Sequence, residues 1–194
     1  MDLVKRVKQI LVSPTTEWQT IDNENDSHVT VLTTYVLLLA AIPALASFIG
    51  YGLIGYSVLG YHIGSVSLGV RQAIVQYINL VAGVYITALI INLMAETFGS
   101  KANFNKAFSL VAYAYTPVFI GGIFYIFPMV GFLAFLASLY GLYLLYIGLA
   151  PMMQTPAEKK TSYFVVSLLV MIAVTVILSL ILAAIIVGRS MTGL

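Results

Sequence analysis

Polar side chains recur along one predicted membrane-spanning helix, at about residues 71–98. The positions that could line a polar path or a substrate site are Gln72, Gln76, Asn79, Thr87, Asn92 and Glu96. At about 100° per residue the first four of these, together with Gly83, lie within a narrow arc, and the last two form a second patch. Such groups usually face protein or water, because exposure to lipid costs roughly a few kcal/mol. The stripe therefore predicts either a polar path or hydrogen bonds between helices, which contribute about 0.6 kcal/mol each.

Short catalytic and metal-binding motifs are absent from the sequence. There is no His-x-x-x-His, no HExxH, no Gly-x-Ser-x-Gly and no Walker loop. The two histidines, His28 and His62, are expected on opposite sides of the membrane, and no pair of carboxylates falls inside a predicted span. The lack of cysteine excludes disulfides, thiolate metal sites and a cysteine nucleophile. We therefore expect a protein that is not an enzyme and that has no cofactor and no metal.

The composition indicates that these polar groups lie in a membrane protein. The chain of 194 residues is 61% hydrophobic and only 8% charged, with a mean hydropathy of +1.02. A soluble domain carries about 25% charged residues. Charges are absent from residues 29–70, 72–95, 107–157 and 161–188. Because a helix crosses a bilayer with about 20 apolar residues, each of these runs is long enough to span it.

The sequence predicts an all-α polytopic membrane bundle with five transmembrane helices. The expected spans are residues 29–50, 71–98, 104–127, 129–150 and 162–187. They form a membrane domain at 29–188, followed by a short extracytoplasmic tail at 189–194. Pro43 and Pro117 should kink the first and third spans. Residues 51–69 are rich in glycine, tyrosine and serine, which favours an ordered extracytoplasmic loop; a re-entrant segment and a sixth span are the alternatives.

The distribution of basic residues predicts the orientation. With five spans, one side of the membrane receives Lys5, Arg6, Lys8, Lys101, Lys106, Lys159 and Lys160. The other side receives Arg71 and Arg189. The positive-inside rule then places the N-terminus in the cytoplasm and the C-terminus outside, across the inner or plasma membrane if the source is a prokaryote. A sixth span would move the last four of those lysines outside, so the bias favours five.

Residues 1–28 are predicted to form a cytoplasmic, interfacial segment. Apolar residues recur at helical spacing at Leu3, Val4, Val7, Ile10 and Leu11, and Lys5, Arg6 and Lys8 occupy the other face. This pattern is typical of a basic amphipathic helix on a membrane surface, with a frayed tail as the alternative. Ser13-Pro14 then starts a second helix. The residues expected to contact the membrane surface are Lys5, Arg6, Lys8 and Trp18, the single tryptophan.

Three segments of the chain resemble the Yip1 family in its short prokaryotic form. They are ILVSPTTEWQTID, FGSKANFNKAFSLVAYAYTPVFIGGI and LYGLYLLYIGLAPMMQTPAEKKTSYFVV. The family pattern would correspond here to Pro14, Trp18, Gly99, Phe104, Tyr113, Tyr115 and Pro117. The resemblance, over about residues 9–187, implies five membrane helices and a cytoplasmic N-terminus. Eukaryotic relatives contact small Rab-type GTPases through longer N-terminal regions, so the resemblance does not imply that partner here.

Two functions are compatible with the sequence. The first is a non-enzymatic membrane scaffold or adaptor that contacts lipids, other membrane proteins or a second copy of itself. The alternative is a small transporter or channel that uses the polar face of the second span. The net charge of +2, with no basic patch clear of the membrane segments, predicts no nucleic-acid partner.

Overall fold

The structure, a computed structural model, describes residues 2–192, with side chains placed through residue 181 except at position 58. Within this part, five helical segments are long and apolar enough to cross a membrane: His28–Ile54, Val66–Met94, Phe104–Ile126, Pro128–Met153 and Ala157–Ile181. The prediction of an all-α polytopic bundle with five spans is confirmed. The predicted tail at 189–194 begins inside the last helix, and residues 193–194 lie outside the described part.

Each span is built from one or more helical elements. Two helices precede the spans, α1 (Leu3–Val12) and α2 (Pro14–Glu24). The first span comprises α3 (His28–Val31), the π-helical η1 (Leu32–Val36), α4 (Leu37–Phe48) and the π-helical η2 (Ile49–Ile54). The second comprises α5 (Val66–Met94), followed by the 3₁₀ turn η3 (Glu96–Phe98). The remaining spans comprise α6 (Phe104–Ala114), α7 (Thr116–Gly121), η4 (Gly122–Ile126), η5 (Pro128–Val130), α8 (Phe132–Met153) and α9 (Ala157–Thr192).

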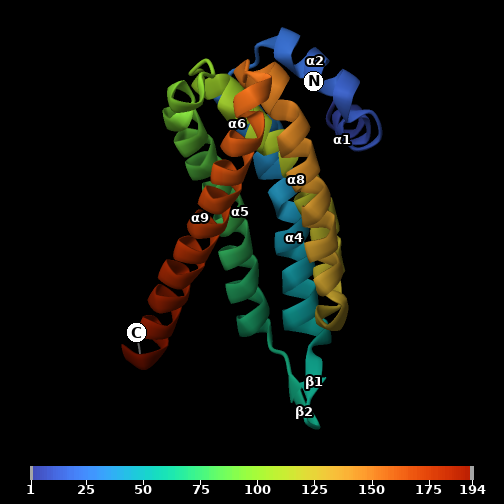
Figure 1. Cartoon of the computed structure of the whole chain (residues 1–194). Coiled ribbons are helices and arrows are strands. Elements are labelled where there is room, and N and C mark those ends of the chain that lie inside the picture. Colours follow the sequence, from blue (N-terminus) through green and yellow to red (C-terminus); the bar gives the residue numbers. More distant parts are fainter. Residues whose placement is uncertain (1, 193–194) are drawn as a thin grey trace.

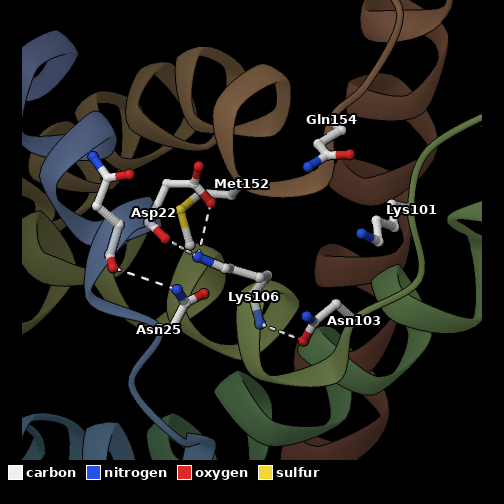
Figure 2. A pocket seen from close by; sticks show the side chains of 8 residues that line it. Asp22, Asn25, Lys101, Asn103, Lys106, Met152 and Gln154 are labelled. Carbon is white, nitrogen blue, oxygen red and sulfur yellow. Dashed lines mark hydrogen bonds and ion pairs between the residues drawn. The ribbon is translucent and has the colours of Figure 1, made fainter.

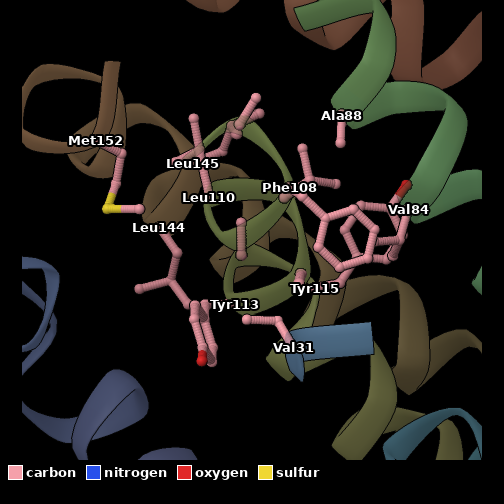
Figure 3. Close-up of a cluster of buried hydrophobic side chains, with 14 of the residues drawn as sticks. Val31, Val84, Ala88, Phe108, Leu110, Tyr113, Tyr115, Leu144, Leu145 and Met152 are labelled. Atoms are coloured by element: carbon pink, nitrogen blue, oxygen red, sulfur yellow. The ribbon is translucent and has the colours of Figure 1, made fainter. Parts of the chain in front are cut away.

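The third span is the centre of the bundle. In the most apolar 18-residue stretch of this span 78% of the residues are buried, whereas in the corresponding stretch of α9 only 11% are buried. Figure 3 shows the core around α6, where Phe108, Leu110 and Tyr113 meet side chains of α5 and α8. Helices α1 and α2 cover one end of the bundle, which we call the capped end, and α9 leans away from α4 and α8 toward its C-terminus (Figure 1).

Residues 51–69 contain a β-hairpin at the end opposite the cap (Figure 1). Strands β1 (Tyr56–Val58) and β2 (Tyr61–Ile63) pair antiparallel. The two turn residues, Leu59 and Gly60, both have positive φ, as a two-residue hairpin turn requires. The first span runs on to Ile54 and the second begins at Val66, so these residues form an ordered connection and not a sixth helix.

The two prolines expected to kink the first and third spans act differently. Pro117 lies in the first turn of α7, directly after the break that separates α6 from α7. This is where a residue without a backbone N–H is tolerated, and the predicted interruption of the third span is present. Pro43 remains inside a continuous α4, and its ring contacts Gly122 of η4. Packing of the first span against the third therefore depends on a glycine facing that ring.

The capped end and the hairpin lie at opposite ends of the spans, so they must face opposite sides of a bilayer. The chain has no cysteine, which makes single-cysteine labelling clean. We expect an impermeant maleimide to label Leu59→Cys in intact cells, because Leu59 is exposed at the hairpin tip. Thr15→Cys, exposed on α2, should react only after permeabilisation if the positive-inside prediction holds. Labelling of both positions from one side would contradict the five-span arrangement.

Candidate functional site

The polar stripe predicted on the second span lies along α5, partly against α9. The Asn79 amide nitrogen donates to the Ser179 hydroxyl of α9 at 3.4 Å, and Thr87 is fully buried. Gln72, Gln76 and Asn92 are half-buried. Glu96 is exposed, in η3 beyond the end of α5. The structure therefore brings Asn79 to α9 and leaves Glu96 apart from the stripe.

Some side-chain oxygens in the α5 and α9 region are buried without a protein partner among the described residues. They are Asn79 Oδ1, Asn92 Oδ1 and Ser167 Oγ. Tyr163, one turn before Ser167, donates its hydroxyl to the Ile91 carbonyl oxygen at 2.6 Å. An unpaired buried polar group costs about 1–3 kcal/mol, so these oxygens are places where water or a polar ligand would be favoured.

A charged cluster lies at the capped end, between α1 and α2. Arg6 lies in α1. One terminal N–H group of its guanidinium donates to the Glu17 carboxylate, and the other donates to the Glu24 carboxylate. The Arg6 and Glu17 side chains are 6% and 4% exposed, while Glu24 is partly exposed. The Arg6 guanidinium carbon also lies 5.5 Å from the ring centroid of Tyr113 in α6. The ion pairs and the aromatic contact together join α1, α2 and α6.

Local sequence explains how the cap forms. The Asp2 carboxylate caps α1 by accepting from the Lys5 backbone N–H at 3.1 Å, and Pro14 opens α2 after a single intervening residue. Glu17 and Glu24 are seven residues apart, so they lie two turns apart on one face of α2 and reach the same guanidinium. The ion pair of Lys106 with Asp22, 2.8 Å between Nζ and Oδ1, fastens the end of α2 to α6.

Burial and charge act in opposite directions on Arg6. Burial alone would lower the pKa of the Arg6 guanidinium. The hydrogen bond to Glu24, with the electrostatic interactions of Tyr113, Glu17 and Glu24, outweighs burial and raises that pKa above its ordinary value. Arg6 is therefore cationic at any physiological pH and remains a positive partner for the carboxylates of α2.

Aromatic packing continues the cluster into the bundle. Trp18 is buried against Tyr113, with ring centroids 6.4 Å apart. Gly148 of α8 leaves the space for the indole, since a Cβ there would lie 2.7 Å from Trp18 Cε2. Tyr35 packs on Tyr113 at 4.7 Å, and its hydroxyl bonds the Thr116 hydroxyl at 2.6 Å. Trp18 is therefore an anchor of α2 in the core.

The structure corrects the predicted membrane contacts of Arg6 and Trp18. Lys5 and Lys8 are exposed on α1, as expected, but Arg6 and Trp18 are buried. Arg6 lies one turn before the buried Ile10, so it faces the bundle, where the folded-back α2 supplies carboxylates. The seven-residue spacing of Glu17 and Glu24 was the available signal for a shared cationic partner.

The positions that match the family pattern fall into two groups. Trp18 and Tyr113 touch, and Tyr115 is buried in the same core. Pro14 and Pro117 each lie in the first turn of a helix. The other group is at the α5–α6 connection, where Gly99 has a φ of +66° after η3, and Phe104 packs on His28 with ring centroids 5.0 Å apart. The motif positions thus contribute core packing, two helix starts and the α5–α6 connection.

A polar pocket of about 260 Å³ also opens at the capped end (Figure 2). It lies between the end of α2, the segment before α6 and the end of α8. Its lining residues are Asp22, Asn23, Asn25, Lys101, Asn103, Lys106, Met152 and Gln154. No local sequence pattern indicates this site, because its residues come from α2, α6, α8 and the segments beside them, which only the fold brings together. Within the described residues no group of three or more His, Asp and Glu side chains could hold a metal ion.

Sequence comparison shows which known proteins this chain resembles. The profile of the Yip1 domain matches residues 8–186. Two relatives, both named inner membrane protein YohC, come from Escherichia coli strains K12 and CFT073. Each is 30% identical over 119 residues, which is 60% of this chain and 61% of the relative, so the match spans less than two thirds of their length. No solved structure matches the chain.

Removal of the Arg6 side chain should release α1 and α2 from the end of the bundle. Arg6→Ala leaves Glu17 buried without its counter-ion, which is expected to destabilise the protein by about 3–5 kcal/mol. The measurement is thermal unfolding of the purified protein in detergent, read by emission of Trp18, the single tryptophan. We expect a lower unfolding temperature and a red-shifted emission. Lys8→Ala removes an exposed cation of the same helix and should change neither. Wild-type values for Arg6→Ala would contradict the role of the ion pairs.

Proposed function

Since this chain belongs to the Yip1 domain family and is a multi-pass integral membrane protein, we propose that it is a non-enzymatic membrane scaffold or adaptor. The capped end is its working surface, facing the cytoplasm, and contacts lipids together with other membrane proteins or a second copy of the chain. The basic residues Lys101, Lys106, Lys159 and Lys160 lie at this end, in the α5–α6 connection and near the starts of α6 and α9, which supports that orientation.

The observation that carries the proposal is the fixed position of α1. The ion pairs of the buried Arg6 with Glu17 and Glu24 tie α1 to α2, and the Tyr140 hydroxyl of α8 donates to the Leu11 carbonyl oxygen at 2.8 Å. A helix attached only by its apolar face could leave the bundle. This helix is also held by ion pairs and by a hydrogen bond to its backbone, which fix its outward face relative to the bundle.

The outward face of α1 combines apolar and basic side chains. Val4 and Val12 are 76% and 72% exposed, and Lys5 and Lys8 are exposed beside them. This combination suits the boundary of an anionic membrane, where apolar groups enter the headgroup region and lysines pair with lipid charges. A partner helix of a neighbouring membrane protein would meet the same surface. The face therefore offers a docking surface at the level of the membrane boundary.

A photo-crosslinking residue at position 8 tests the adaptor function in native membranes. We expect position 8 to yield a defined crosslinked protein, either a partner or a second copy, and Arg6→Ala to abolish that product because α1 is no longer held. The matched control is position 176 on α9, which is also exposed and should contact lipid only. Reciprocal purification that recovers no partner, with membrane lipid content unchanged when the gene is deleted, would exclude the adaptor function.

A second candidate function, a small transporter or channel, is favoured by the unpartnered oxygens of Asn79, Asn92 and Ser167. A permeating ion or water molecule could supply the partners that they lack in the protein. Helices with interrupted or polar segments are typical of transporter sites. The stripe of α5, including Gln72, Gln76 and Thr87, would then line the path.

Flux through proteoliposomes tests this alternative. If the chain conducts, flux should exceed that of protein-free liposomes and fall by about tenfold or more in Asn79→Ala, since the polar lining is lost. Gln76→Ala and Glu96→Ala extend the series along the stripe. Leu89→Ala, on the exposed face of α5, is the control and should leave flux unchanged. Absence of flux for every ion tried, or flux untouched by these substitutions, would rule the alternative out.

A further inference from the structure

We propose that the polar pocket at the capped end binds a phosphodiester headgroup that carries a hydrogen-bond donor beside its phosphate, such as glycerol or ethanolamine. The inference deepens the proposed function, because it names the lipid chemistry that the capped end would recognise. The cavity of about 260 Å³ lies below the range of about 300–1,000 Å³ typical for drug-sized ligands. Its size therefore suits a headgroup and not an entire lipid.

One wall of the pocket presents nitrogen atoms. In Figure 2 the nitrogen ends of Lys101, Asn103 and Gln154 face the same hollow. The Asn103 carbonyl oxygen accepts the Lys106 backbone N–H at 3.3 Å, which leaves the Asn103 amide nitrogen available to donate into the pocket. The Lys101 backbone N–H donates to the Met153 carbonyl oxygen at 2.9 Å and so holds this connection beside α8. An ammonium and two amides around one space form a set of donors suited to phosphate oxygens.

The opposite wall carries the acceptors. The Asp22 carboxylate pairs with Lys106, and Asn25 ends α2 with positive φ. Helix C-termini bear partial negative charge, so this wall favours a donor group. A choline headgroup has no such donor, whereas glycerol hydroxyls or an ethanolamine ammonium can bond both Asp22 and the end of α2. The pocket therefore discriminates between headgroups by hydrogen bonding.

The net charge of the pocket favours an anionic group at its centre. Lys106 is neutralised by Asp22, and among the described residues Lys101 has no ion-pair partner, so the lining carries one uncompensated positive charge. Helix α6 begins at Phe104 without an acidic residue in its first turn, which adds the positive end of its dipole.

The position of the pocket matches the depth of lipid headgroups. Asn25 precedes the first span, Lys101 and Asn103 connect the second and third, and Gln154 follows the fourth. The lining residues are thus level with the ends of four spans, where a bilayer presents its phosphates. Basic pockets between membrane helices are known to bind lipid headgroups in this setting.

Titration of the purified full chain with short-chain lipids in detergent tests the proposal. We expect dihexanoyl phosphatidylglycerol and phosphatidylethanolamine to bind at least about tenfold more tightly than dihexanoyl phosphatidylcholine. Lys101→Gln should weaken binding about tenfold, as expected for loss of a hydrogen bond to a charged group. Gln154→Gly removes an amide at a backbone position of φ +51° that glycine adopts readily, and should weaken binding several-fold.

Lys159→Gln is the matched control, because Lys159 is an exposed lysine at the same end that does not line the pocket. Trp18 emission and the unfolding temperature report whether each variant is folded. Equal losses for Lys101→Gln and Lys159→Gln would overturn the proposal in favour of unspecific surface charge. Equal binding of phosphatidylcholine, or no binding of any phosphate-bearing probe, would overturn it as well.

Glycerol 3-phosphate and inorganic phosphate, titrated separately, distinguish the source of the ligand. Binding of the short-chain lipids alone supports a membrane headgroup, and equal binding of glycerol 3-phosphate supports the same site with a soluble phosphate ester. These results are independent of the crosslinks at position 8 of α1, so failure of the pocket and failure of the adaptor function can be told apart.

Discussion

Lipid cannot bond a backbone N–H or C=O, and the rest of this structure depends on that constraint. The spans remain helical, and the strands lie in a hairpin beyond their ends. Tyrosine hydroxyls bond carbonyl oxygens on neighbouring helices: Tyr77 donates to Leu37, Tyr140 to Leu11 and Tyr163 to Ile91. The third span, which is interrupted before Pro117, is also the most buried, so its irregular backbone is enclosed by protein. The contacts that pack the helices together therefore also satisfy backbone hydrogen-bonding groups.

The capped end adds an electrostatic constraint. A buried arginine is tolerated only when its charge is compensated, and here Glu17 and Glu24 supply the counter-charge while Tyr113 contributes its ring face. The same arrangement places Trp18 over Gly148 and orients the exposed face of α1. The stability of α1 and α2 at this end and the orientation of α1 consequently depend on one guanidinium. The polar pocket lies beside this cluster, at the end of α2, and shares Lys106 and Asp22 with the contacts that fasten α2 to α6.

The two candidate regions differ in how the sequence encodes them. The stripe on α5 follows from helical period within one span, so Asn79 and Thr87 could be assigned to a common face in advance. Whether such a face meets lipid, water or another helix depends on a partner far along the chain, which for Asn79 is Ser179. The pocket combines Asp22, Lys101 and Gln154 from distant parts of the chain, and no local pattern relates them.

The sequence alone determined the number of spans, because length and hydropathy fix where a chain can cross a bilayer. It also predicted the start of α2 at Pro14 and an interruption of the third span at Pro117, since both prolines act through their own backbone geometry. Only the tertiary structure decided the environment of Arg6 and Trp18, because the same amphipathic pattern suits a membrane surface or a protein groove. That choice depends on the folding of α2 back over α1, which brings two carboxylates to the guanidinium and is not a local property of either helix.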